Sequence, residues 1–271
     1  MKVVIIGTGN TATVSGKKIQ EAGHEIIQVI GRNFEKANLL ASLLHSASAY
    51  NVRYVSLEAD IYMLAVSDTA ISSVASGLKL KNKIVVHTAA AVSKDVLAAS
   101  SENYGVLYPL QTLIKETEIL PSIPVLIDGS NAYTKNILKD FCANWAGTTQ
   151  IANDEERLKL HVAAVFVSNF SNYLFSMAEQ YCRKEHLKFN LLYPLIEETI
   201  KRLKSQSSSE TQTGPAVRED YETIEKHRGS LKNYPELSSL YNFLTDSIIR
   251  FYNKNKTLSN STDISNRIEN I

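Results

Sequence analysis

The first twelve residues constrain the fold more than any other stretch of the chain. Residues 3–6 are a short β-branched run, typical of a strand buried on both faces of a parallel sheet. Gly7 and Gly9 follow at once, and Ala12 completes the pattern Gly-x-Gly-x-x-Ala. Between a strand and a helix, this spacing lets the backbone approach a pyrophosphate, whose charge meets free N–H groups at the helix start. The pattern predicts a dinucleotide-binding loop; the alternative is a plain glycine-rich turn.

The end of the second predicted strand indicates which dinucleotide is bound. Residues 25–30 read as a strand, and Gly31-Arg32-Asn33 follows it. In NAD-binding units a carboxylate near this point accepts a hydrogen bond from the ribose 2′-hydroxyl, whereas an arginine suits the 2′-phosphate of NADP. Arg32 is permanently charged and can bind a phosphate through two parallel hydrogen bonds. We therefore expect NADP as the cofactor; a solvated surface arginine is the alternative.

Strand and helix patterns alternate as far as residue 151. Strand-like runs recur at 60–66, 83–86, 104–112, 123–127 and 148–151, and helical patterns occur at 12–22, 34–45 and 130–146. This alternation predicts an α/β fold with an N-terminal, Rossmann-type, mostly parallel sheet. Ligands of such sheets bind beyond the carboxyl ends of the strands. His87 stands at one such end, where it either takes part in chemistry or orders its loop by hydrogen bonding.

From Asn153 onward apolar residues recur at the spacing of an α-helix, which predicts an all-α C-terminal domain. We place the boundary near residue 152, with a nucleotide-binding domain over 1–152 and a helical domain over 153–271. One long helix is expected from Asp154 to Cys182, and its many apolar residues predict that it is largely buried. Four polar residues would then be buried with it, and they either satisfy neighbouring helices or face a ligand: His161, Ser168, Asn169 and Asn172.

Composition limits the possible partners and cellular location. The net charge is +1, which argues against strong attraction to nucleic acid or to an anionic membrane. No signal peptide precedes the first strand and no apolar run reaches about 18 residues, so a cytoplasmic protein is expected. Cys142 and Cys182 are too far apart in sequence to suggest a metal pair, and no metal site is predicted.

Several segments together resemble one family. They are Gly7–Ala12, Leu64–Asp68, Val85–Thr88 and Gly105–Thr112 in the first half, and His161–Asn172 and Gln212–Arg218 in the second. This combination resembles the Rossmann-like proteins that carry a domain of unknown function, DUF2520, and are described as NADP oxidoreductases. The resemblance implies a helical second domain akin to that of 6-phosphogluconate dehydrogenase and pyrroline-5-carboxylate reductase, and such domains usually mediate dimerisation.

The resemblance and the loop pattern together give a set of expected cofactor contacts. These are Gly7, Thr8, Gly9, Asn10, Thr11, Ala12, Arg32, Asn33, Ala65, Val66, Ser67, His87 and Thr88. One departure from the family is visible: Ala89, Ala90 and Ala91 follow Thr88, where members often carry Ser-Gly. This change removes a hydroxyl near the expected position of the nicotinamide.

The leading functional hypothesis is hydride transfer between NADPH and a small carbonyl or imine. The rival is a catalytically silent protein that senses NADP or binds a partner. Expected catalytic residues are His161, Asn169, Asn172 and His87, and a proton could also come from Tyr108 or from solvent. The long helix has no lysine between Lys159 and Lys184, which argues against a β-hydroxyacid dehydrogenase and favours an imine reductase. We further expect a homodimer formed through the helical domain.

Overall fold

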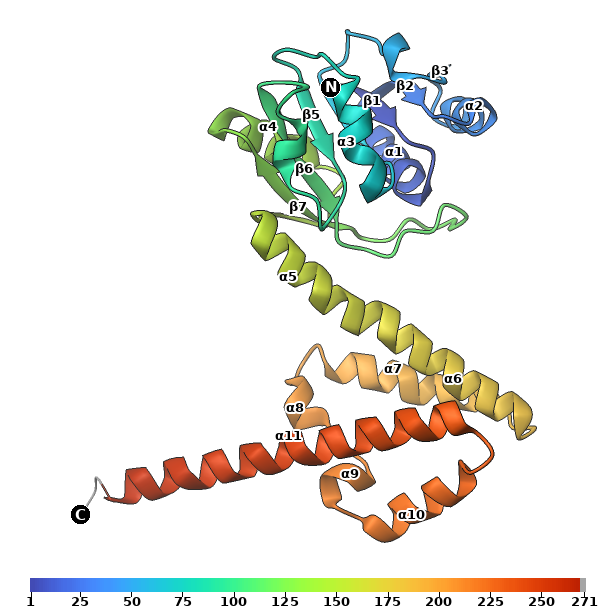
Figure 1. Cartoon of the computed structure of the whole chain (residues 1–271), viewed down its shortest axis with the longest axis vertical. Helices are drawn as coiled ribbons and strands as arrows, with labels where there is room; N and C mark the ends of the chain where they lie inside the picture. Colours follow the sequence, from blue (N-terminus) through green and yellow to red (C-terminus); the bar gives the residue numbers. More distant parts are fainter. Residues whose placement is uncertain (269–271) are drawn as a thin grey trace. The chain divides into compact units, whose positions relative to one another are not determined.

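The computed structural model describes the chain over residues 1–268. By their internal contacts the residues divide into two compact units, Met1–Ser171 and Asn172–Ile271, and each unit is described by itself. The first unit contains an eight-stranded sheet, and the second is helical throughout (Figure 1). The predicted fold class, a mostly parallel α/β sheet followed by a helical region, is therefore confirmed. No helix in the described part of the chain is both long and apolar enough to cross a membrane.

The sheet has the strand order β3-β2-β1-β4-β5-β6-β7-β8. The strands are β1 (Lys2–Ile6), β2 (Glu25–Ile30), β3 (Ala47–Ala49), β4 (Ile61–Leu64), β5 (Ile84–His87), β6 (Asn103–Pro109), β7 (Pro124–Gly129) and β8 (Thr148–Ile151). All neighbours pair in parallel except β6 and β7. The chain runs outward from β1 to β3 and then returns to β4 on the other side of β1. The carboxyl ends of β1 and β4 therefore flank the topological switch point, where open α/β sheets bind ligands.

Helices cover both faces of this sheet. On one face α1 (Asn10–Glu21), α2 (Phe34–Leu43) and α4 (Ala132–Cys142) contribute to a single buried cluster. On the other face α3 (Asp68–Ser76) and the 3-10 helix η2 (Lys94–Leu97) pack into a second cluster. The central strands β1 and β4 supply side chains to both clusters, which explains their continuous apolar sequences. A further 3-10 turn, η1 (Val52–Tyr54), follows β3.

One strand was missed by the sequence analysis. The three residues of β3, Ala-Ser-Ala, include no β-branched or aromatic side chain, so the local sequence carries no strand signal. The strand exists because its backbone pairs with Gln28, Val29 and Ile30 of β2. Tertiary pairing, rather than local preference, decides its structure.

The predicted long helix is present but contains a local change of pitch. It consists of α5 (Asp154–Ala164), a π-helical segment η3 (Val165–Phe170) and α6 (Ser171–Lys184). The two compact units divide within it, after Ser171. The sequence pattern instead places the end of the strand–helix alternation near residue 152, and that domain boundary stays a prediction.

The expected burial of this helix is wrong for the single chain. Large apolar side chains along η3 and α6 are exposed, and Val167 exposes 77% of its surface. Asn169 and Asn172 are exposed, while His161 and Ser168 are half-buried. An apolar sequence shows that a helix surface should be covered, but it does not say which surface covers it.

The second unit continues with six further helical segments after α6. These are η4 (Phe189–Leu192), α7 (Tyr193–Arg202), α8 (Ser208–Thr211), α9 (Pro215–Arg218), α10 (Tyr221–Ser230) and α11 (Pro235–Ile268). The predicted start of a helix at Pro215 is confirmed, with Gly214 as its N-cap at φ +112°. The last helix, expected over residues 236–252, continues to Ile268.

Candidate functional site

Gly7 holds β1 against β4 at the switch point. Its φ angle is +132°, and a Cβ atom built at this position would lie 2.0 Å from the carbonyl oxygen of Ala65. The Gly7 N–H donates to the Ile30 carbonyl at 2.8 Å, which ties the turn to β2 as well. Any side chain here would collide with the backbone and require a strained φ angle. The loop therefore needs glycine for its own geometry, before any ligand is considered.

The start of α1 is open to an anion. Gly9 is the N-cap, no side chain caps the helix, and its first turn contains no acidic residue. The N-termini of α2, α4 and α5 are instead capped by Asn33, Asn131 and Asn153. A Cβ atom at Gly9 would meet nothing within 4 Å, so packing does not explain this second glycine. Free N–H groups beside open space fit a nucleotide phosphate.

The residues around this loop occupy the positions that the motif predicts. Ala12 is fully buried and lets α1 close on the sheet. Thr8 lies against Gly31, where a Cβ atom would approach the Thr8 Cγ2 atom to 2.6 Å. Asn10 is exposed at the helix start, and Thr11 is half-buried.

Arg32 is available to a ligand. Its side chain is exposed and makes no hydrogen bond or ion pair with another residue in the part of the chain that the structure describes. Asn33 has a structural task, because its side-chain oxygen accepts a hydrogen bond from the Lys36 N–H at 2.9 Å and caps α2. A free guanidinium beyond β2 fits the 2′-phosphate of NADP, as the sequence analysis expects.

Residues beyond β4 and β5 line the same edge of the sheet. Ala65 is buried, Val66 is half-buried and Ser67 is exposed at the start of α3. The Thr88 hydroxyl donates to the Leu64 carbonyl at 3.4 Å. These positions follow strands on one side of the switch point, so they can contact a ligand held by the Gly7–Ala12 loop.

His87 orders the loop that follows β5. The ring is fully buried, and its Nδ1 atom accepts a hydrogen bond from the Ala89 N–H at 3.2 Å. The Nε2 atom lies 3.3 Å from the Ser93 carbonyl oxygen and donates to it in the matching tautomer. Burial, followed by the nearby charge of Arg157, lowers the pKa of His87 to about 4. Of the two roles left open by the sequence, this geometry favours loop ordering over proton donation.

We expect His87 to make the free energy of unfolding depend on pH. The unfolded state takes up a proton near pH 6.5, whereas the folded state takes it up only near pH 4. Stability should therefore fall as the pH falls through this window, by up to about 3 kcal/mol. Denaturant titrations at several pH values should show a weaker dependence in His87→Gln. An unchanged dependence, or a ring pKa above 6 by NMR, would contradict this account.

Arg157 is a structural anchor that the sequence analysis missed. Its side chain is 1% exposed and donates to the carbonyls of Ala90 at 3.0 Å and Val92 at 2.6 Å, and to Asp154 at 2.8 Å. It therefore ties the start of α5 to the alanine-rich loop after β5. In the sequence, Asp154 and Arg157 stand three residues apart, a spacing that indicates an ion pair along one helix. It does not indicate that Arg157 binds the loop after β5.

Two polar pairs join the long helix to the exit of β6. The Tyr108 Oη and His161 Nδ1 atoms are 3.0 Å apart, and the two rings meet edge to face. The hydroxyls of Thr112 and Ser168 are 2.9 Å apart. Burial, then the charge of Asp68 at the start of α3, raises the pKa of Tyr108, so its hydroxyl stays protonated near neutral pH. These pairs give the first unit a polar surface beside the carboxyl ends of its strands.

The π-helical segment contains two of the expected site residues. Ser168 and Asn169 lie within it, and Asn172 follows near the start of α6, in the second unit. Such segments are frequent at functional sites, because the wider turn changes which side chains share a face. Asn169 and Asn172 have no side-chain hydrogen bond within the described residues, so their amides can contact a ligand.

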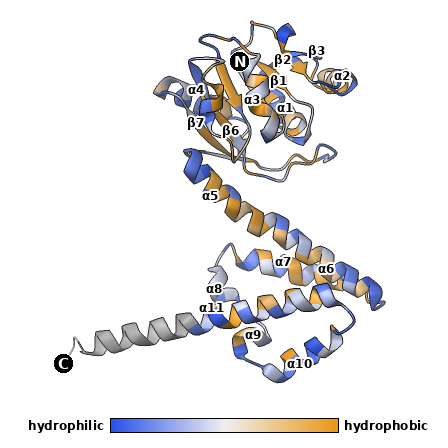
Figure 2. Ribbon diagram, viewed as in Figure 1, coloured by the Kyte–Doolittle hydropathy of each residue, from blue (hydrophilic) through white to orange (hydrophobic). Residues whose placement is uncertain are grey.

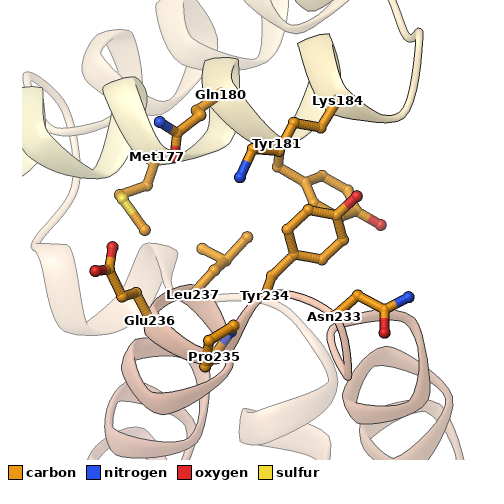
Figure 3. A pocket seen from close by; sticks show the side chains of 9 residues that line it. All are labelled: Met177, Gln180, Tyr181, Lys184, Asn233, Tyr234, Pro235, Glu236 and Leu237. Atoms are coloured by element: carbon orange, nitrogen blue, oxygen red, sulfur yellow. The ribbon is translucent and has the colours of Figure 1, made fainter.

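The second unit has a pocket of its own, of about 310 Å³, between α6 and the start of α11. Figure 3 shows Gln180 and Lys184 on one side and Glu236 across from them. The Lys184 Nζ atom lies 5.4 Å from the centre of the Tyr234 ring, whose hydroxyl donates to Glu185. None of the expected site residues lines this pocket.

Comparisons with known families match both halves of the chain. A family described as "NADP oxidoreductase coenzyme F420-dependent" matches residues 2–91, and DUF2520, a domain of unknown function, matches residues 123–248. No curated protein sequence matches the chain.

Solved structures resemble the chain over nearly its whole length. A "putative NADP oxidoreductase" from Bacteroides fragilis is 32% identical, with a TM-score of 0.84 over 92% of this chain and 98% of that one. A pyrroline-5-carboxylate reductase from Streptococcus pyogenes is 14% identical, with a TM-score of 0.63 over 92% and 98%. A reductive aminase from Aspergillus terreus is 16% identical, with a TM-score of 0.69 over 92% and 93%. The last two show the fold alone, whereas the first shows the family. The chain therefore belongs to the Rossmann-fold NADP oxidoreductases that carry DUF2520.

Proposed function

We propose that this oxidoreductase transfers hydride from NADPH to a small carbonyl or imine substrate. The observation that carries the proposal is the pair of polar contacts, Tyr108 with His161 and Thr112 with Ser168, at the exit of β6. They lie beside the edge of the sheet where a nucleotide fits the open start of α1 and the free guanidinium of Arg32. A purely structural role would not need both features in one unit.

In this proposal each group of residues has a separate task. The N–H groups at the start of α1 hold the pyrophosphate, and Arg32 holds the 2′-phosphate. NADPH supplies the hydride when it is bound. The reduced nitrogen or oxygen must gain a proton, and the hydrogen-bonded pair of Tyr108 and His161 can hold one beside it, because histidine is suited to proton transfer near neutral pH. Asn169 orients the substrate, since an amide can donate or accept hydrogen bonds but cannot serve as an acid.

An imine fits these residues better than a hydroxyacid does. The long helix places no lysine on the same stripe as His161; Lys159 is exposed and paired with Glu155. An imine nitrogen is more basic than a carbonyl oxygen, so the one proton that its reduction needs can come from a pair such as Tyr108 and His161, without a lysine. The names of two structural neighbours agree with this class: a pyrroline-5-carboxylate reductase, and a reductive aminase solved with cyclohexanone and allyl amine.

Removing the His161 ring should slow turnover without weakening cofactor binding. For His161→Ala we expect kcat to fall about 100-fold, the usual contribution of a positioned acid or base, with an unchanged Kd for NADPH. The matched control is His227→Ala, because His227 forms the same kind of contact, 2.9 Å from the Tyr241 hydroxyl, in the second unit. The assay is NADPH oxidation against a panel of cyclic imines and ketones. Equal kcat values for His161→Ala and His227→Ala would contradict the assigned role.

The same panel, with hydroxyacids and NADP⁺ added, separates an imine reductase from a hydroxyacid dehydrogenase and from a silent NADP sensor. An imine reductase turns over cyclic imines and leaves hydroxyacids untouched with NADP. Turnover of a hydroxyacid at ordinary enzymatic rates would overturn the imine assignment. Tight NADPH binding with no turnover of any substrate would favour the silent NADP sensor instead.

We also propose that the protein forms a homodimer through its helical region. Several helices of the second unit expose apolar side chains, and Figure 2 shows hydrophobic residues along α6, α7 and α11. Leu191 precedes α7 and Leu195 lies one turn later, with 73% and 64% of their surfaces exposed. A surface of this kind is stable in water only when it is covered, and a second copy of the same chain brings a matching one.

Charged substitutions on this surface should separate the two copies. We expect light scattering at micromolar concentration to give a dimer for the unaltered chain and a monomer for the double variant Leu191→Asp, Leu195→Asp. The control is Leu39→Asp, since Leu39 is similarly exposed, at 71%, but lies on α2 of the first unit. A monomeric unaltered chain with both units folded would contradict the proposal.

A further inference from the structure

Three aromatic rings and an arginine gather beyond the ends of β2 and β3. The residues are Phe34, Tyr50, Arg53 and Tyr54, which we call the aromatic–arginine cluster. The Phe34 and Tyr50 rings meet edge to face with centroids 6.4 Å apart, and the Tyr50 and Tyr54 rings lie 5.2 Å apart. All three rings are about half exposed, although apolar groups of this size are normally buried.

The cluster borders the turn that carries Arg32. Ile30 pairs with Ala49 in the sheet, and the Gly31 N–H donates to the Ala49 carbonyl at 3.0 Å. Arg32 and Tyr50 are therefore each the first residue beyond this hydrogen bond, on neighbouring strands. The contact between the Phe34 and Tyr50 rings then brings together the turn after β2 and the turn after β3.

The polar groups of the cluster converge. The hydroxyls of Tyr50 and Tyr54 are 3.0 Å apart. The Arg53 guanidinium carbon lies 4.9 Å from the centre of the Tyr54 ring. The Tyr54 hydroxyl, and then the Arg53 guanidinium, lower the pKa of Tyr50. One guanidinium and two phenols form a set of donors suited to an oxyanion.

The distribution of arginine in the first unit supports a ligand role. This unit has three arginines: Arg32, Arg53 and Arg157. Arg157 is buried and bound to the Asp154 carboxylate, as a structural arginine should be. Neither Arg32 nor Arg53 has a carboxylate partner among the residues that the structure describes. The two guanidinium groups thus follow neighbouring strand ends without a carboxylate partner from the protein, which leaves both available to an anion.

We infer that Arg53, with the hydroxyls of Tyr50 and Tyr54, forms the second half of the 2′-phosphate site, opposite Arg32. The ligand is the phosphomonoester on the adenosine ribose of NADP. This inference rests on the proposed function, since it needs the cofactor to lie along the carboxyl edge of the sheet. A phosphomonoester has three oxygens free to accept hydrogen bonds, so one guanidinium does not saturate it. Stacking of the adenine on the exposed rings is the competing role, and it would not distinguish NADP from NAD.

The test compares two cofactors that differ only in this phosphate. Calorimetry on the full chain would give Kd values for NADP⁺ and NAD⁺, and for adenosine 2′,5′-bisphosphate and adenosine 5′-monophosphate. For Arg53→Ala we expect NADP⁺ and the bisphosphate to bind about tenfold more weakly, with the other two ligands changed less than about twofold. The double variant Tyr50→Phe, Tyr54→Phe should shift the same two ligands in the same direction, by a smaller factor. The control is Lys139→Ala, which removes one exposed charge from α4 and should change none of the four.

Each possible result either supports or overturns the assignment of Arg53 to the 2′-phosphate site. Unchanged NADP⁺ affinity in Arg53→Ala would overturn the inference. Equal loss of NADP⁺ and NAD⁺ affinity would also overturn it and would assign the cluster to adenine. If Arg53→Ala fails to fold, Arg53→Gln keeps much of the length and polarity of the side chain and serves as the second variant. These outcomes are separate from failure of the proposed function, in which the unaltered chain turns over no carbonyl or imine.

Discussion

Replacing Arg32 by alanine should remove most of the preference for NADP(H) over NAD(H). Charge-assisted hydrogen bonds to a phosphate contribute roughly 1.5–3 kcal/mol each, so the preference in the unaltered chain should be at least about tenfold. Arg32 is exposed and has no protein partner in the described residues, so its removal should cost the fold almost nothing. Calorimetry with both cofactors gives the comparison directly.

One more variant separates the contribution of the planar guanidinium from that of its positive charge alone. Arg32→Lys keeps the positive charge but loses the planar pair of donors, so it should restore only part of the preference. Lys36→Ala removes a neighbouring charge on α2 and serves as the control for net charge. Equal affinities of the unaltered chain for NADP⁺ and NAD⁺ would sink the assignment.

Gly7→Ala should have the largest effect of any single substitution in the nucleotide loop. The new Cβ atom would lie 2.0 Å from the Ala65 carbonyl oxygen, and the φ angle of +132° is unfavourable for any side chain. Strained backbone alone costs on the order of 1–3 kcal/mol, and the collision adds to it or forces β1 and β4 apart. We expect a much lower melting temperature and no measurable NADP⁺ binding.

Substitutions at two other glycines separate the effect of backbone strain from the effect of the collision with Ala65. Gly23 has φ +83° and open space for 4 Å around the position that a Cβ atom would take, so Gly23→Ala measures the backbone strain without a collision. Gly9 has φ −87° and equally open space, so Gly9→Ala should leave stability unchanged and weaken only cofactor binding. Thermal melts with and without NADP⁺ distinguish all three. A Gly7→Ala protein as stable as Gly23→Ala would show that the loop tolerates a side chain.

The nucleotide-binding half could be predicted well because its signals are local. The apolar run of β1, the spacing of Gly7 and Gly9, and the arginine after β2 all lie within about thirty residues, and each has a direct backbone or charge consequence. The structure adds the partner that the loop needs, the Ala65 carbonyl at the end of β4. That contact joins residues almost sixty positions apart, so no local pattern could identify it.

The polar pairs beside the long helix were beyond sequence reasoning. Tyr108 and His161 are 53 residues apart, and Thr112 and Ser168 are 56 apart. The sequence identified His161 and Ser168 as polar members of an apolar helix, with neighbouring helices or a ligand as their expected partners. Their partners are side chains at the exit of β6. The π-helical turn, which sets the direction of Ser168 and Asn169, has no sequence signal that separates it from an ordinary helix.

The central claim is that the chain carries out hydride transfer, and isotope labelling tests it most directly. The unaltered protein would be incubated with NADPH deuterated at C4 of the nicotinamide, on either face, and with a panel of cyclic imines, ketones and ketoacids. The account predicts that one deuterium appears on the former imine carbon of a product, from only one of the two labelled faces, and that His161→Ala slows its appearance. Bound NADPH that transfers no label to any imine or ketone would contradict it.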